Sequence, residues 1–341
     1  MWGALASVVA VALGALTFAS ARSSVARYYL NSSLYVFSMG LSSTLGIVYS
    51  VMLSIAGKRL NTNAWVAATF YFLIHHLIGF RITMDGEQYL EERPIILVGN
   101  HQSVLDIFYL GKIMRERTVI MAKKELRWVP LLGQFMMLGG NIFIDRKSRA
   151  SAIKTMNEAG EYMHKNKIAL FAFPEGTRSH FAVPDLLSFK KGIFHLAIQT
   201  KIPIVPVVCE NYYRLYDSKT RFDPGNIRLS VLPPISTEGF TEQNLDALMS
   251  KVHRAMLAKV HEFDVQADQY DVQSTMHPSQ QAQTSWQGGV SGLAARIIGD
   301  GGPAHHKKLV DRVATEQRDH QTGKGQAPSS YGLVSAAAAN S

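Results

Sequence analysis

A histidine and an aspartate five positions apart, His101 and Asp106, have the residue types of a general base and of the carboxylate that orients it. The ordinary pKa of imidazole lies near ~6.5, which suits proton abstraction at neutral pH. A carboxylate bonded to the second ring nitrogen would hold the tautomer and stabilise the imidazolium. Residues five apart in a regular helix diverge by about 140°, so we expect His101 in a strand-to-helix turn and Asp106 one turn into the helix. Taken alone, the pair fits a structural hydrogen bond at least as well.

A second polar cluster, Phe173–Ser179, reads Phe-Pro-Glu-Gly-Thr-Arg-Ser and follows an apolar run. Gly176 permits the backbone to approach a ligand closely, and Thr177 and Ser179 offer hydroxyls. Arg178 offers a planar fork that can grip a phosphate through two hydrogen bonds. Because open α/β sheets bind ligands at the carboxyl ends of their strands, an anion site is one interpretation. A helix-capping turn with an ordinary surface arginine is the other, and the segment alone leaves both open.

Two further segments carry less chemistry of their own. Gly139–Arg146 predicts a strand that ends in Asp145 and Arg146, and this arginine could equally pair with Asp145 or face water. Ile202–Val208 predicts a buried core strand that at most could wall an acyl chain. The single cysteine, Cys209, excludes an internal disulfide framework and any multi-cysteine metal site, and its apolar neighbours predict a buried thiol.

The composition is apolar and basic. Hydrophobic residues make up 47% of the 341-residue chain and charged residues only 18%, below the roughly 25% of ordinary soluble domains. The 35 Lys and Arg residues against 26 Asp and Glu residues give a formal net charge of +9. Such an excess suits nucleic acid, an anionic bilayer surface or phosphorylated substrates. Because the chain has no nucleic-acid motif and no basic stripe interleaved with aromatic residues, we expect no nucleic-acid partner.

Three apolar stretches near the N-terminus predict contact with a membrane. The first two, about 2–21 and 34–56, have no charged residue and are long enough to span a bilayer. A cleaved signal peptide is the alternative for the first, but no Lys or Arg precedes it, and an uncleaved anchor is favoured. The third, 64–80, is shorter and contains His75 and His76, so we expect it to lie in the membrane interface.

After these stretches, short apolar runs alternate with helix-like segments. The runs are Pro94–Gly99, Thr118–Ala122, Asn141–Asp145, Ile168–Phe173, Pro203–Cys209 and Ile227–Leu232. The helix-like segments are Val104–Arg115, Val129–Leu138, Ala150–Lys165, Lys191–Thr200 and Glu242–Glu262. This alternation predicts an α/β fold, a mostly parallel sheet flanked by helices and preceded by N-terminal transmembrane and interfacial helices. We expect membrane-anchoring helices over 1–80, the α/β domain over 81–264, and a disordered tail over 265–341.

Taken together, the four polar and apolar segments resemble the glycerolipid acyltransferase family in their order and intervals. The first pattern of that family is Asn-His, four residues, then Asp, and it stands intact at Asn100–Asp106. Its third pattern, Phe-Pro-Glu-Gly-Thr-Arg-Ser, stands intact at Phe173–Ser179. The resemblance runs from about Gly79 to Val260. It is strongest to the fungal 1-acylglycerol-3-phosphate acyltransferases of the endoplasmic reticulum.

The resemblance implies direct acyl transfer from acyl-CoA to the sn-2 hydroxyl of lysophosphatidic acid, which makes phosphatidic acid without a covalent acyl-enzyme. His101 would take the proton of that hydroxyl, and Asp106 would hold the ring. The residues implied to bind the acceptor are Asn100, Lys123, Arg146, Glu175, Gly176, Thr177 and Arg178. No metal ion and no cofactor is implied, with acyl-CoA as co-substrate, because cationic side chains meet the phosphate charge. The implied partners are the two substrates and the lipid bilayer, and the implied location is the endoplasmic reticulum membrane.

Other classes of function stay open from the residues alone. A hydrolase could use the same pair to activate water against a lipid ester, although no serine has the Gly-x-Ser-x-Gly surroundings of a serine esterase. A non-catalytic membrane scaffold or lipid-binding protein would fit the apolar stretches and the basic balance. Within the enzymes, glycerol 3-phosphate or a lysophospholipid with a larger head group could be the acceptor.

Overall fold

The computed structural model describes residues 19–145 and 149–275. Three expectations lie wholly or mostly outside these ranges: the apolar span at 2–21, the phosphate ligand Arg146, and the tail from residue 276 to the end. The expected domain boundary near position 80 and the expected disorder of the tail beyond residue 275 stay predictions.

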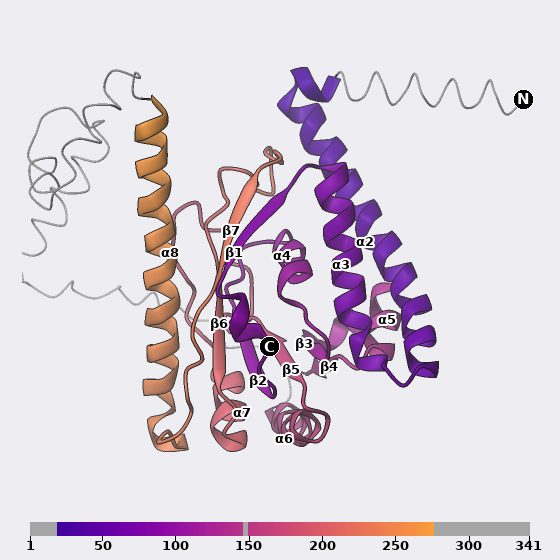
Figure 1. Ribbon diagram of the computed structural model, residues 1–341, viewed down its shortest axis with the longest axis vertical. Helices are drawn as coiled ribbons and strands as arrows, with labels where there is room; N and C mark the ends of the chain where they lie inside the picture. Colours follow the sequence, from indigo (N-terminus) through magenta and orange to yellow (C-terminus); the bar gives the residue numbers. More distant parts are fainter. Residues whose placement is uncertain (1–18, 146–148, 276–341) are drawn as a thin grey trace, which may run out of the picture. The chain divides into compact units, whose positions relative to one another are not determined.

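A seven-stranded sheet forms the centre of the fold, in the order β1-β7-β6-β2-β5-β3-β4 (Figure 1). The strands are β1 (Arg81–Asp85), β2 (Ile95–Gly99), β3 (Thr118–Lys123), β4 (Ile142–Ile144), β5 (Ala169–Ala172), β6 (Ile204–Cys209) and β7 (Asn226–Val231). All neighbouring pairs are parallel except β6 and β7. The predicted α/β class with a mostly parallel sheet is therefore confirmed. The expected strands do not include β1, because this edge strand alternates between buried and exposed residues and lacks a continuous apolar run.

Different helices cover the two faces of the sheet (Figure 1). The helices are α2 (Ser24–Ile55), α3 (Thr62–Leu77), α4 (Asp106–Ile113), α5 (Leu132–Leu138), α6 (Arg149–Asn166), α7 (Gly192–Thr200) and α8 (Leu245–Thr275). On β2, Ile95 and Leu97 pack with residues of α2, α3 and α4, whereas Ile96 and Val98 pack with residues of α6, α7 and α8. Because both faces are buried, the central strands consist of consecutive apolar residues.

The long helix α2 is part of the same compact unit as the sheet, which extends to Asp271. It begins where Oγ of Ser23 accepts the backbone N–H of Ala26, well before the expected span at 34–56. Among the described residues it is the one helix long and apolar enough to cross a membrane. Nevertheless Tyr35 is buried, and its hydroxyl donates to the carbonyl of the residue at position 104, over 2.7 Å. The helix therefore packs on the α/β unit along part of its length.

Large apolar side chains stay exposed on α2 and α3. On α2 they are Val25, Tyr29, Val36, Phe37, Val48, Val51, Met52 and Ile55, and on α3 they are Trp65, Phe72 and Leu77. The helix α3 nearly coincides with the stretch expected to lie in the membrane interface. Exposed large apolar side chains gathered on two neighbouring helices are typical of an interaction site, a membrane contact among them.

The C-terminal helix α8 continues past Glu262, where the amphipathic pattern predicts its end. Its apolar residues Leu248, Val252 and Met256 recur every four positions and pack on the sheet. From Phe263 to Thr275 the chain contains neither glycine nor proline, so nothing local stops the helix there. The first ten or so residues of the expected tail are therefore helical.

Candidate active site

The turn between β2 and α4 brings His101 and Asp106 into contact. The strand β2 ends at Gly99 and α4 begins at Asp106, which leaves His101 in the connecting turn. Nδ1 of His101 lies 2.8 Å from Oδ2 of Asp106. The two side chains meet because the turn lies between them, whereas five residues of continuous helix would hold them apart. This is the placement that their spacing predicts, and their catalytic role stays a prediction.

The carboxylate of Asp106 is completely buried and is surrounded by donors. Its Oδ2 accepts the backbone N–H of Gln102 at 2.6 Å and that of Ser103 at 2.9 Å. Its Oδ1 accepts the hydroxyl of Tyr212 at 2.7 Å. A buried charge requires such partners. Since Nδ1 of His101 is bound to this carboxylate, Nε2 is the ring nitrogen left to accept a proton from a substrate.

The ring of His101 is stacked on that of Phe173. The centroids are 3.8 Å apart, and the planes meet at 15°. Phe173 follows directly on β5, the strand next to β2, so the stack joins the ends of two neighbouring strands. The His101 side chain is 15% exposed. The imidazole is thus held in one orientation while part of it stays accessible to a substrate.

The carboxylate of Glu175 holds two loops of the site together. Its Oε1 accepts the backbone N–H of His101 at 2.6 Å, and its Oε2 accepts that of Leu187 at 3.0 Å. Burial raises the pKa of Glu175 to about 7; the two backbone hydrogen bonds oppose this shift, and the charge of Asp106 adds to it. Both oxygens face the protein, and the side chain is 1% exposed. The expected role of Glu175 as a substrate ligand stays a prediction.

The chain that follows Glu175 is bound to the turn that carries His101. The N–H of Ser179 donates to the carbonyl of His101 over 2.8 Å. Gly176 has a φ of +73°, a conformation that suits glycine. Thr177 and Arg178 are exposed on this loop. The structure therefore brings three of the expected phosphate-binding residues to the same end of the sheet as His101.

Asn100 is buried and ties the end of β2 to the end of β6. Its Nδ2 donates to the carbonyl of Cys209 over 2.9 Å, and its Oδ1 accepts the N–H of Cys209 at 2.8 Å. Its own carbonyl accepts the hydroxyl of Tyr109 at 3.0 Å. Burial raises the pKa of the Cys209 thiol well above its ordinary value, as the apolar neighbours of this residue predict for an inert thiol. These contacts fix the ends of β2 and β6 relative to each other next to His101. Substrate binding by Asn100 stays a prediction.

The basic residues expected near the phosphate follow strands on the same edge of the sheet. Lys123 ends β3, and its side chain is more than half exposed. Its neighbour Lys124 forms an ion pair with Asp145, directly after β4, over 3.1 Å. Because β2, β5, β3 and β4 are parallel neighbours, their carboxyl ends share one edge. Arg146 follows Asp145 in the sequence but lies outside the described residues.

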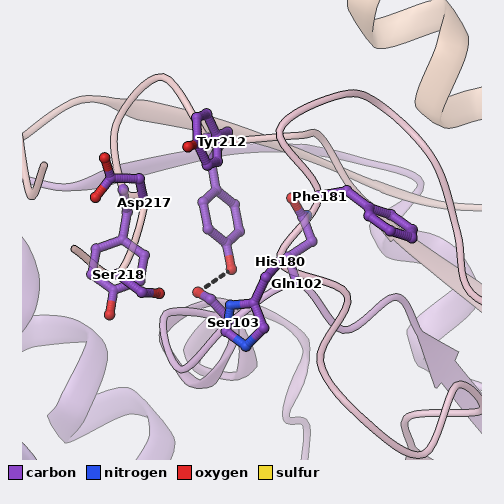
Figure 2. Close-up of a pocket in the computed structure, with 9 residues that line it drawn as sticks. Gln102, Ser103, His180, Phe181, Tyr212, Asp217 and Ser218 are labelled. Atoms are coloured by element: carbon purple, nitrogen blue, oxygen red, sulfur yellow. Dashed lines mark hydrogen bonds between the residues drawn. The ribbon is translucent and has the colours of Figure 1, made fainter. Parts of the chain in front are cut away.

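Sequence reasoning missed Tyr212, which lies in the loop after β6 and reaches Asp106. Figure 2 shows its phenol beside the hydroxyl of Ser103, at 2.7 Å, next to a hollow of about 20 Å³. No spacing in the sequence links Tyr212 to residues more than a hundred positions earlier, so only the folded chain reveals this contact. In the part of the chain that the structure describes, no group of three or more His, Cys, Asp or Glu side chains could hold a metal ion.

Comparison with known proteins agrees on one family. The family model described as Acyltransferase matches residues 81–210. The chain is 41% identical to the 1-acyl-sn-glycerol-3-phosphate acyltransferase of Saccharomyces cerevisiae over 69% of this chain and 78% of the relative. It is 34% identical to the human 1-acyl-sn-glycerol-3-phosphate acyltransferase alpha over 70% of this chain and 82% of that protein. The crystal structure of the 1-acyl-sn-glycerophosphate (LPA) acyltransferase PlsC from Thermotoga maritima is similar with a TM-score of 0.55 and 25% identity, over 70% of this chain and 98% of that one.

Proposed function

The chain belongs to the 1-acyl-sn-glycerol-3-phosphate acyltransferase family, and from this premise we propose that it transfers the acyl group of acyl-CoA to the sn-2 hydroxyl of lysophosphatidic acid. The product is phosphatidic acid. The observation that carries the proposal is the 2.8 Å contact between His101 and the buried Asp106 at the carboxyl edge of the sheet. An oriented imidazole with one free nitrogen is what activation of a hydroxyl requires.

In the proposed reaction, Nε2 of His101 takes the proton of the acceptor hydroxyl as its oxygen attacks the thioester carbonyl. Asp106 stabilises the imidazolium that forms. The carbon–sulfur bond then breaks, the ester is complete, and the departing thiolate of coenzyme A receives the proton. No covalent acyl-enzyme, metal ion or cofactor takes part in this scheme. The acyl group thus moves from the sulfur of coenzyme A to the acceptor oxygen, and one proton moves from that oxygen to the sulfur.

For the acceptor phosphate we assign Arg178, with Gly176 and Thr177 in the same loop. Arg178 is exposed, and its loop is hydrogen-bonded to the His101 carbonyl through Ser179. A guanidinium so placed can hold a phosphate while the neighbouring hydroxyl reaches His101. Arg146 and Lys123 are assigned to the same phosphate, since Lys123 ends a parallel strand at the same edge and Arg146 follows another in the sequence.

For Asn100 and Glu175, which the resemblance implies as substrate ligands, we instead propose a role in the framework of this site. The side-chain amide of Asn100 bonds to β6 through both its oxygen and its nitrogen. The carboxylate of Glu175 is bonded to the N–H groups of His101 and Leu187. Each therefore acts on the substrate through the loops that it holds.

We further propose that the enzyme works at a membrane, and in a eukaryotic cell at the endoplasmic reticulum. The support is the number of large apolar side chains that are exposed on α2 and α3. A lysophospholipid and a long-chain acyl-CoA both partition to bilayers, so an active site attached to such a surface meets both substrates there. The formal charge of +9 favours an anionic leaflet.

The direct test supplies purified protein with labelled oleoyl-CoA and three acceptors: lysophosphatidic acid, glycerol 3-phosphate and lysophosphatidylcholine. We expect label in phosphatidic acid and little in the other products. Label in another acceptor would change the proposed substrate. Release of free oleate without transfer would identify a thioester hydrolase. The His101→Ala variant, assayed in parallel, serves as the control for any contaminating acyltransferase.

A further inference from the structure

Tyr212 is a buried phenol that touches the proposed catalytic pair although it lies on another part of the chain. It is 2% exposed, in the loop that follows β6. Its hydroxyl lies 2.7 Å from Oδ1 of Asp106 and 2.7 Å from Oγ of Ser103. The first contact is to the oxygen of Asp106 that His101 does not use.

The direction of these hydrogen bonds follows from the number of protons. An ionised carboxylate only accepts, so Tyr212 must donate its single proton to Asp106. Ser103 must then donate its own proton to the phenol oxygen of Tyr212. Oγ of Ser103 in turn accepts the backbone N–H of Leu105 at 3.0 Å. The result is a chain of donors that runs from the Leu105 N–H through two hydroxyls and ends on the carboxylate.

Burial and the charge of Asp106 raise the pKa of the Tyr212 phenol well above its ordinary value, so it stays protonated and remains a donor. Hydrogen bonds in such a chain polarise one another. Each donor to Asp106 withdraws part of the negative charge that the carboxylate offers to His101. A carboxylate with less free charge stabilises the imidazolium of His101 less.

We propose that Tyr212 is a positioning residue that, through Asp106, sets the basicity of His101. This inference rests on the proposed function for its consequence in catalysis, but the effect on His101 is a property of the folded protein alone. Ser103 strengthens the effect, since its hydroxyl donates to Tyr212. Apart from His101, Tyr212 is the side chain that donates to Asp106 in the described residues, the other donors being backbone N–H groups.

The test measures the titration of His101 directly, by NMR of protein labelled with carbon-13 histidine, with the His101→Ala spectrum to identify the signal. In Tyr212→Phe we expect the midpoint for His101 to rise by about 0.5–1 pH unit, the size of one lost hydrogen bond. Ser103→Ala should raise it by less. In each variant, the acidic limb of the pH profile of kcat/KM should move by as much as the His101 midpoint moves in that variant. Two other groups titrate in this range: the acceptor phosphate and Glu175, whose carboxylate accepts the His101 backbone N–H and has its pKa raised to about 7. Both are common to all variants and do not contribute to the difference.

Tyr109→Phe is the matched control. Tyr109 is also a buried phenol, but it donates to the Asn100 carbonyl and not to Asp106. Its loss should lower Tm without moving the His101 midpoint. An unchanged or lowered midpoint in Tyr212→Phe, or an equal shift in Tyr109→Phe, would overturn the inference. A raised midpoint in a protein that transfers no acyl group would support the inference and contradict the proposed function.

Discussion

The backbone N–H of His101 donates to Oε1 of Glu175 over 2.6 Å, so the Phe-Pro-Glu-Gly loop holds the turn between β2 and α4 in place. The second oxygen of Glu175 is bound to Leu187, which ties a third segment to the same point. Glu175 thus forms a structural bridge between the turn that carries His101 and the loop that carries Arg178.

Replacement of Glu175 by glutamine should therefore lower kcat more than it raises the KM for lysophosphatidic acid. The amide has one acceptor oxygen where the carboxylate has two, so one of the N–H groups of His101 and Leu187 loses its partner. Hydrogen bonds to charged groups contribute roughly 1.5–3 kcal/mol, which sets an upper range of about 10- to 150-fold for kcat. Steady-state kinetics in both substrates would measure this. A rise confined to the acceptor KM would instead make Glu175 a direct substrate ligand.

The raised pKa of Glu175 also predicts how stability depends on pH. Its folded-state pKa is about 7 against an ordinary value of 4.5, so the folded state binds the proton more tightly than the unfolded state does. The stability that this proton contributes is complete below the pKa of Glu175 in the unfolded state. It is lost as the pH rises through the pKa of Glu175 in the folded state. Between pH 4.5 and 7, the free energy of unfolding of the wild type should fall by about 3 kcal/mol relative to that of Glu175→Gln. Thermal unfolding of both proteins across this range measures it, and parallel Tm curves would contradict the assignment.

His101→Ala should lower acyl transfer by about 10²–10⁴-fold, the usual effect of removing a general base. Its Tm should also fall, because the variant removes the ring stacked on Phe173 and one partner of the buried Asp106 carboxylate. Asp106→Asn should lose activity too and also lower Tm, since its carboxylate accepts the N–H groups of Gln102 and Ser103. Radiolabel transfer and thermal unfolding in the same detergent separate the two effects. Activity within about twofold of wild type in His101→Ala would contradict its role as the base.

Arg178→Lys keeps the charge but loses the planar fork, so the KM for lysophosphatidic acid should rise about 10- to 150-fold with little change in the KM for acyl-CoA. Arg146→Lys should show the same selectivity if both arginines grip one phosphate, and the double variant should depart from additivity. Arg115→Lys is the control, because Arg115 pairs with Glu87 and Glu91 instead. A rise in the acyl-CoA KM alone would reassign Arg178 to the donor's phosphates.

Phe37→Glu should weaken binding to vesicles that contain anionic lipid by about tenfold or more, because the exposed ring of Phe37 would otherwise be buried in the bilayer. Vesicle flotation measures this. Val265→Glu is the control, since Val265 is also exposed but lies on α8, at the other face of the sheet. Equal flotation of the wild type, Phe37→Glu and Val265→Glu would show that α2 does not contact the membrane. Deletion of residues 1–56 is a poorer test, because it also removes the buried Tyr35.

Much of the fold follows from local patterns that the chain carries in itself. Six of the seven strands coincide with the predicted runs. The central strands β2, β5 and β6 are continuously apolar because both of their faces are buried. The edge strand β1 is half exposed, and its alternating residues do not stand out from a loop. The amphipathic pattern ends at Glu262 whereas α8 continues to Thr275, since composition alone does not show where a helix without glycine or proline stops.

The sequence by itself determined which residues could do the chemistry, since the contact between His101 and Asp106 is local and needs only a strand, a turn and the first turn of a helix. Only the tertiary structure decided what surrounds them. Glu175 and Tyr212 lie 74 and 106 positions away from their partners His101 and Asp106, and no periodicity encodes such pairs. They meet because parallel crossover connections return β5 and β6 to either side of β2, and the register of those strands, set by side-chain packing on both faces, brings the loops after them to one edge.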